Sequence, residues 1–86
     1  MVSLKDLHIE IISPTGIIFD DYCYMATIPS TNGELGIMKN YEPTLSRLKA
    51  GKINIYNNKQ EITKSFEING GFANNIENKL IVLLDN

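Results

Sequence analysis

Apolar and polar residues alternate with a period of two along most of this 86-residue chain, and turn-forming residues interrupt the alternation every few positions. Successive side chains of a β-strand point to opposite faces, so this pattern is typical of strands with one buried face. It is clear in residues 7–11, where leucine and isoleucine alternate with histidine and glutamate. About nine or ten short segments of this kind predict an all-β fold, a β-sandwich or flattened barrel of about ten strands.

Turn residues set the expected strand boundaries. Pro14-Thr15-Gly16 and Asn57-Asn58-Lys59 are typical of tight turns, because proline presets φ and asparagine tolerates left-handed backbone. We expect Asp20-Asp21 to form a polar turn and Gly33-Glu34-Leu35-Gly36 to form a shaped surface turn. Pro43 to Leu48 is compatible with one helical turn, with proline at an early position.

Three strands carry more specific expectations. Tyr22 to Ile28 alternates as one strand, which places Tyr22, Tyr24, Ala26 and Ile28 on one face. Leu80 to Leu84 is apolar at every position, which suits a central strand covered on both faces. Lys64 shares the parity of the apolar residues around it, so its strand should lie near an edge, or its side chain should snorkel to water.

Size and charge limit the possible functions. The length suits one domain spanning residues 1–86, and a net charge of -2 with scattered lysines argues against nucleic-acid binding. The single cysteine, Cys23, forms no internal disulfide and fits a reducing compartment as a buried apolar residue. Residues 1–6 lack the apolar region of a secretion signal, and no apolar run approaches the roughly 20 residues that span a bilayer. A partner must therefore bring the chain to any membrane it serves.

No combination of residues predicts catalysis, a cofactor or a metal. His8 is the only histidine and lacks a partner motif, which indicates a surface or interface residue. Asp20 and Asp21 would point to opposite faces of a strand and so do not converge on one substrate. Gly70-Gly71 is followed by a strand-like segment and not by the helix that a phosphate cradle needs, which favours a bulge or a close backbone approach between sheets.

Six short motifs follow one another in a fixed order. They are Leu7-His8-Ile9-Glu10-Ile11-Ile12-Ser13 with the Pro14-Thr15-Gly16 turn, Gly33-Glu34-Leu35-Gly36-Ile37, Tyr41-Glu42-Pro43-Thr44-Leu45, Leu48-Lys49-Ala50-Gly51, Asn69-Gly70-Gly71-Phe72, and Val82-Leu83-Leu84-Asp85. Together they resemble the N-terminal β-sandwich of the epsilon subunit of F-type ATP synthases, which is called delta in mitochondria. The resemblance extends from about residue 6 to residue 86.

The resemblance implies a non-catalytic subunit of the central stalk, which couples the gamma subunit to the c ring of a proton-translocating synthase. By motif position, Glu34 faces the polar loops of the c ring, and Ser13, Tyr41 and Ser46 lie toward gamma. It also implies no cofactor, and a peripheral place on the cytoplasmic face of a bacterial inner or plasma membrane, reached only through the complex.

Two departures from the family limit what the resemblance carries over. Tyr41 stands where the family has histidine in its His-x-Pro segment, so any proton-linked role of that histidine is lost. The family usually continues into a C-terminal helical hairpin. We expect this hairpin to be absent, which would leave a coupling-only subunit or a piece cut at the domain boundary.

Two other classes of function compete with this reading. A free-standing β-sandwich module that binds peptides or glycans would need a concave aromatic surface, and it leaves the order of the motifs unexplained. Its only tyrosines would be Tyr22, Tyr24, Tyr41 and Tyr56. A small hydrolase lacks any pairing of nucleophile and base.

Overall fold

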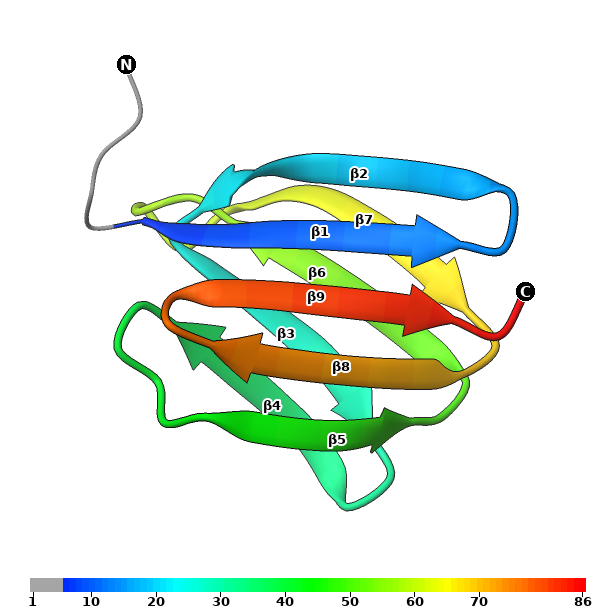
Figure 1. The fold of residues 1–86 in the computed structure, drawn as a ribbon. Coiled ribbons are helices and arrows are strands. Elements are labelled where there is room, and N and C mark those ends of the chain that lie inside the picture. Colours follow the sequence, from blue (N-terminus) through cyan, green and yellow to red (C-terminus); the bar gives the residue numbers. More distant parts are fainter. Residues whose placement is uncertain (1–5) are drawn as a thin grey trace.

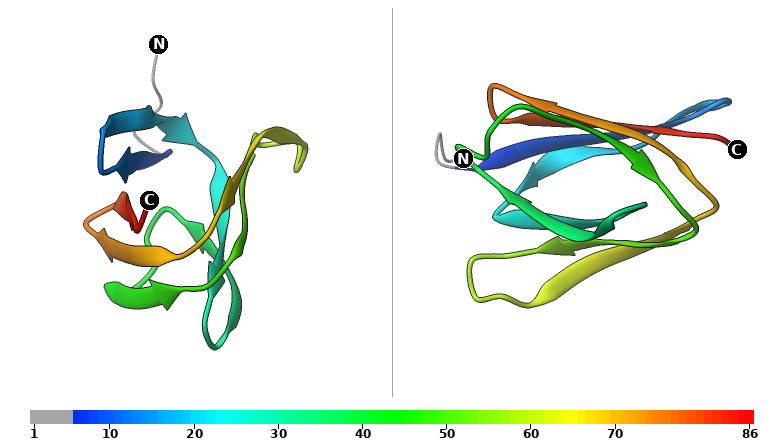
Figure 2. Two further views of the ribbon diagram at one scale, coloured as in Figure 1. Left: turned by 90° about the vertical axis from the view of Figure 1, so that its right-hand side faces the viewer. Right: turned by 90° about the horizontal axis from the view of Figure 1, so that it is seen from below.

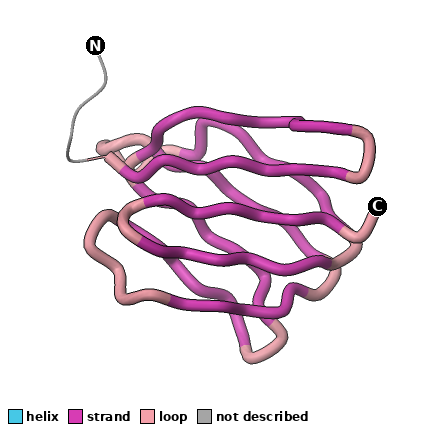
Figure 3. The backbone as a smooth tube through the Cα atoms, in the orientation of Figure 1, coloured by secondary structure: helices cyan, strands magenta, loops and turns pink. Residues whose placement is uncertain are grey.

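A computed structural model describes residues 6–86, and within that range the chain forms nine strands and no helix (Figures 1 and 3). The prediction of no secretion signal concerns the N-terminus, of which residues 1–5 lie outside this range. The strands are β1 (Leu7–Ser13), β2 (Gly16–Cys23), β3 (Met25–Ser30), β4 (Gly33–Met38), β5 (Thr44–Leu48), β6 (Gly51–Tyr56), β7 (Ile62–Ile68), β8 (Gly71–Ile76) and β9 (Lys79–Leu84). The predicted all-β class is confirmed.

The strands form one continuous sheet that folds over into two layers, which Figure 2 shows facing each other. The strand order is β2-β1-β9-β8-β5-β3-β6-β7, and β4 pairs with β3 off this path. We call β2-β1-β9-β8-β5 the front layer and β4-β3-β6-β7 the back layer. Only one residue pair, Ser30 with Leu48, joins β3 to β5, so the sheet bends between these strands. All pairings are antiparallel except that of β1 with β9, which is parallel.

The core lies between the two layers and is filled mainly by branched aliphatic side chains. Alternate residues are buried in β1, β6, β8 and β9, as the period-two pattern predicts, whereas β3 is buried at five consecutive positions. β-Branched side chains such as isoleucine suit this pleated, close-packed environment. The buried apolar residues are Leu7, Ile9, Ile11, Cys23, Ala26, Ile28, Ile37, Leu48, Ile53, Ile55, Ile68, Ala73, Leu80 and Val82.

Gly71 allows β8 and β9 to approach each other more closely than any other residue would permit. A Cβ atom on Gly71 would lie 2.2 Å from the carbonyl oxygen of Leu83, and its φ of 155° is one that side-chain-bearing residues rarely adopt. A close backbone approach is thus confirmed at Gly71, but the prediction that it lies between sheets is wrong, because it joins the paired strands β8 and β9 of the front layer. Gly71 thus allows the close pairing of β8 with β9, in which the next residue, Phe72, lies opposite Leu83.

The two strands at the ends of the strand order carry features that limit pairing with other chains. β7 lies at one end of the strand order, and Lys64 is exposed there at an inward-facing position, opposite the buried Ile55. The prediction for Lys64 is thus confirmed, and an inward-pointing lysine is a known protection of sheet edges. β2 lies at the other end, where the backbone N–H of Tyr22 donates to the carboxylate of Asp21 at 2.8 Å.

Two predictions of local structure are wrong. Residues 43–48 form no helical turn, because residues 44–48 pair along their whole length with β8 as strand β5. Cross-strand hydrogen bonds outweigh the weak helical preference of so short a segment. The Gly33-Glu34-Leu35-Gly36 segment is not a turn either. It lies in strand β4, and the turn of the β3–β4 hairpin falls at residues 31–32.

The predicted strand from Tyr22 to Ile28 is also wrong, because the chain bends at Tyr24 between β2 and β3. The bend resets the alternation, so Cys23 is buried together with Ala26 and Ile28, whereas Tyr22 is exposed. Asp20-Asp21 is not a turn but part of β2. There Asp20 lies opposite Glu10 of β1.

Candidate functional site

The most prominent surface feature is an apolar row that crosses the outer face of the front layer. Strand registers place Ile17 opposite Ile12, Ile12 opposite Leu83, and Leu83 opposite Phe72, so four adjacent strands each contribute one residue. The side chains of Ile17, Leu83 and Phe72 are 58%, 51% and 43% exposed. Contiguous exposed apolar side chains on a rigid sheet are typical of a protein-binding surface.

Arg47 of β5 ends this row. It lies opposite Phe72, and its guanidinium carbon is 5.1 Å from the centre of the Phe72 ring, a cation–π contact. Arginine and aromatic residues are enriched at the centres of protein interfaces. We call the row Ile17, Ile12, Leu83, Phe72 and Arg47 the front row.

Two more cross-strand rows lie beside the front row on the same outer face. The nearer row holds Asp20, Glu10, Ile81, Asn74 and Leu45, and the farther row holds Tyr22, His8, Lys79 and Ile76. The apolar and aromatic members Leu45, Ile76 and Tyr22 are exposed, so the face combines an apolar stripe with a charged corner.

The charged corner is built around His8. Its Nε2 atom lies 2.5 Å from the Asp20 carboxylate, and its ring stacks on Tyr22 with ring centres 4.6 Å apart. The ammonium of Lys79 lies 3.9 Å from the carboxylate of Glu10. The prediction of a surface or interface role for His8 agrees with this placement on the outer face.

Glu34, predicted to face the c ring, lies near the tip of the β3–β4 hairpin. It is exposed and stands opposite Pro29, and Gly33 precedes it with a φ of 123°. The hairpin is fixed beside β5, because the backbone N–H of Lys49 donates to the Pro29 carbonyl at 2.9 Å. Glu34 has no ion pair among residues 6–86, so its carboxylate faces solvent.

The three residues predicted to lie toward gamma are not brought together. Ser13 lies at the β1–β2 turn, where its hydroxyl donates to the Gly16 carbonyl at 3.1 Å. Tyr41 lies in the β4–β5 loop and packs partly against the core. That loop is hydrogen-bonded to the β8–β9 turn, near the start of β1 and thus at the opposite end of β1 from Ser13. Ser46 is half-buried in β5, on the side of the buried Leu48.

Sequence reasoning missed the front row. Its five members come from five strands in three separate parts of the sequence, and only the register of pairing aligns them. A signal was present in the segment 80–84, which is apolar at every position. The prediction that this strand is covered on both faces is wrong, because Leu80 and Val82 are buried whereas Leu83 is half-exposed. The strand is central in the front layer, and its outer side is open.

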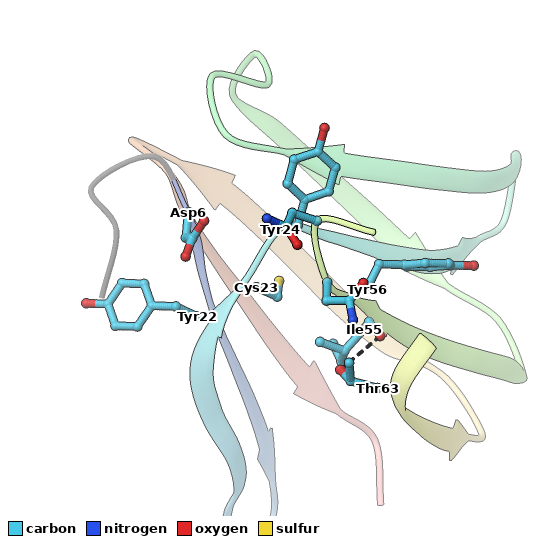
Figure 4. Close-up of a pocket in the computed structure, with 9 residues that line it drawn as sticks. Asp6, Tyr22, Cys23, Tyr24, Ile55, Tyr56 and Thr63 are labelled. Carbon is cyan, nitrogen blue, oxygen red and sulfur yellow. Dashed lines mark hydrogen bonds between the residues drawn. The ribbon is translucent and has the colours of Figure 1, made fainter. Parts of the chain in front are cut away.

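A depression of about 560 Å³ lies where β2 passes into β3, beside the β6–β7 turn (Figure 4). Cys23 and Ile55 lie at its centre, and the rings of Tyr22, Tyr24 and Tyr56 point away from one another. The three tyrosine hydroxyl groups therefore do not converge on a common ligand. Burial, helped by the charges of Asp6 and Asp21, raises the pKa of the Cys23 thiol from 9.0 to about 12, which leaves it protonated and unreactive at neutral pH.

Two other kinds of site are absent from residues 6–86. No three His, Cys, Asp or Glu side chains lie close enough to share a metal ion. No helix in the described range is long and apolar enough to cross a membrane.

Comparison with known sequences gives a consistent result. The family model for the ATP synthase delta/epsilon chain, β-sandwich domain, matches residues 6–86. The ATP synthase epsilon chain of Campylobacter concisus is 38% identical over 82 residues, covering 95% of this chain and 63% of that relative. The epsilon chain of Lacticaseibacillus casei is 32% identical over 80 residues, covering 92% of this chain and 56% of that relative. The chain thus spans less than two thirds of the length of these relatives.

Comparison with solved structures supports the fold. A chain of the Euglena gracilis mitochondrial ATP synthase, OSCP/F1/c-ring in rotational state 1, superposes with a TM-score of 0.84 at 18% identity, covering 100% of this chain and 54% of that chain. A chain of the central stalk/c-ring of the Tetrahymena thermophila mitochondrial ATP synthase gives a TM-score of 0.73 at 17% identity, with 100% and 67% covered. At these identities the likeness concerns the fold.

Proposed function

We propose a function from the premise that this chain belongs to the family of ATP synthase delta/epsilon chains, in their β-sandwich domain. In this proposal it is a non-catalytic part of the central stalk, which transmits rotation between the gamma subunit and the c ring. It would sit at the cytoplasmic face of a bacterial membrane, held there by the complex, in keeping with the bacterial relatives. The peptide- or glycan-binding alternative is not favoured by these comparisons.

One observation carries the proposal, namely the front row, in which exposed apolar side chains of adjacent strands lie next to one another on one sheet face. A coupling subunit must resist torque through a rigid, extensive contact. A sheet face supplies this, because its side chains are fixed by pairing on both sides. Phe72, stacked under Arg47 and flanked by Leu83, has the composition of an interface centre. We assign this face to gamma.

The four residues named by the family resemblance lie outside the front row. Glu34 on the β3–β4 hairpin is free to meet basic groups of the c-ring loops, although an exposed pair contributes only about 0–1 kcal/mol. Ser13, Tyr41 and Ser46 remain proposed gamma contacts. Ser13 follows Ile12 of the front row, whereas Tyr41 lies at the other end of β1 and Ser46 is on the core side of β5, so in this proposal these two contact gamma outside the front row.

Calorimetric titration of this chain with purified gamma subunit tests the proposal. Leu83→Ser should weaken binding at least about tenfold, the effect of losing about 1.4 kcal/mol. The matched control is Ile62→Ser on the back layer, because Ile62 is 53% exposed and Leu83 51%. The control should bind gamma like the unmodified chain. Equal affinities for both variants would refute the assignment of gamma to the front face. A lack of binding by the unmodified chain would overturn the proposed function.

A further inference from the structure

The charged corner of the front outer face has an excess of negative charge, and a partner that docks there would have to bury it. Asp20 of β2 lies directly opposite Glu10 of β1, and like charges in this position repel each other. Lys79 supplies one positive charge, 3.9 Å from Glu10. With His8 neutral, the corner therefore carries one excess negative charge, and with His8 protonated it is neutral.

The geometry points to a docking face that takes up a proton. We propose that binding of gamma to the front outer face is coupled to protonation of His8, which neutralises Asp20 as the corner loses contact with water. This inference rests on the proposed function, because it requires that gamma covers this face.

His8 is well placed for this role. Its imidazole contacts Asp20 directly and stacks on Tyr22, so an added proton is shared with a carboxylate that is already in place. Imidazole is the side chain whose charge ordinarily changes between pH 5 and 8. His8 is also the only histidine of the chain, so no other imidazole here competes for the proton.

The groups that face His8 are few. β2 contributes Asp20 and Tyr22, β9 contributes Lys79, and β1 itself contributes Glu10. The other charged residues on the flanking segments are Asp6, Asp21 and Glu77, and none of them forms an ion pair within residues 6–86. The balance of charge therefore depends on the His8–Asp20 contact.

Docking on the front row would cover this corner. The two flanking rows lie two and four residues along the strands from the front row, or about 7 and 13 Å at 3.3 Å per residue. An ordinary protein interface buries about 800 Å² on each partner, more than a patch of this width requires. Burying an unpaired carboxylate is costly, whereas a carboxylate paired with imidazolium is tolerated.

The test is a calorimetric titration with gamma at pH 6, 7 and 8, in buffers that differ in ionisation enthalpy. We expect up to one proton to be taken up on binding, and affinity to rise toward low pH by no more than about tenfold per pH unit, the limit that linkage sets for one proton. The buffer dependence of the binding heat gives the proton count directly.

Two variants separate this coupling from a purely structural role, because they should act in opposite directions. Asp20→Asn removes the excess charge, so its affinity at pH 8 should match or exceed that of the unmodified chain at pH 6. His8→Gln leaves Asp20 uncompensated, so its affinity should stay at the low level at every pH. Glu67→Gln, on β7 of the back layer, is the control and should keep the unmodified pH dependence.

Each outcome is decisive. Binding with no proton uptake, or with the same pH dependence in the His8→Gln variant, overturns the inference and leaves the proposed function intact. A complete lack of gamma binding at every pH overturns the proposed function itself, and this inference with it.

Discussion

Replacing Gly71 by alanine tests the most specific packing feature of the fold. The new Cβ atom would lie 2.2 Å from the Leu83 carbonyl oxygen and 3.0 Å from the Leu84 Cα atom. Carbon–oxygen contacts between strands are normally about 3.3 Å or longer, so β8 and β9 must separate by about 1 Å. Both obstructing atoms belong to the backbone, so no side-chain rotation relieves the clash.

The expected loss of stability has two parts. An alanine at this φ costs about 1–3 kcal/mol in backbone strain. Separating the strands weakens ladder hydrogen bonds worth about 1 kcal/mol each. We therefore expect Gly71→Ala to lose about 3–5 kcal/mol, a large part of the roughly 5–15 kcal/mol that stabilises a typical domain.

Gly33→Ala is the matched control. Gly33 also has a left-handed φ, 123°, but nothing lies within 4 Å of its added Cβ atom. The Gly33→Ala variant should therefore lose only the stability that corresponds to backbone strain. Urea unfolding followed by circular dichroism and tyrosine fluorescence measures both variants, since the chain has no tryptophan. Equal losses for the two variants would refute the clash between β8 and β9 as the reason for the glycine.

Three further predictions follow from single side chains. Because burial raises the pKa of Cys23 to about 12, the native thiol should resist iodoacetamide at pH 8 and react once urea unfolds the chain. The same shift stabilises the fold below pH 9, and that contribution should fall as pH rises toward 12, a trend that Cys23→Ala should flatten in urea titrations. Asn78→Ala removes the acceptor of the Asn40 N–H, a 2.7 Å hydrogen bond, and should accelerate hydrogen exchange at Asn40 while leaving β6 amides protected. Lys64→Ile removes the inward-pointing charge from the β7 edge and should produce concentration-dependent association in sedimentation experiments. A variant that stays monomeric at all concentrations would contradict the protective role of Lys64.

The sequence predicts the strands of this fold better than it predicts their connections. Period-two alternation locates the strand pairs because a buried face requires it, as in β1 and β6. It fails at Tyr24, where a bend between two strands leaves no mark in the alternation. It also fails at residues 44–48, where β8 supplies the hydrogen bonds that decide between helix and strand.

The candidate site is less accessible to sequence reasoning, for a physical reason. A surface on one face of a sheet is assembled across strands, so its members are related by register and not by spacing. Ile17 and Phe72 are 55 positions apart, and only Ile12 and Leu83 between them in space complete the row. Motif resemblance assigned Ser13 to the side of gamma, but it could not show that the hydroxyl of Ser13 is engaged within its own turn.

The faces and edges of this sandwich are treated differently, and the difference indicates how it is used. The β2 edge has a backbone donor occupied by Asp21, and the β7 edge carries the inward lysine, so both discourage added strands. The front face between them keeps Leu83 and Phe72 exposed, a feature that selection for solubility alone would remove. The guarded β2 and β7 edges and the open apolar face favour one defined partner that docks on the flat of the sheet, and they disfavour pairing along these two strands.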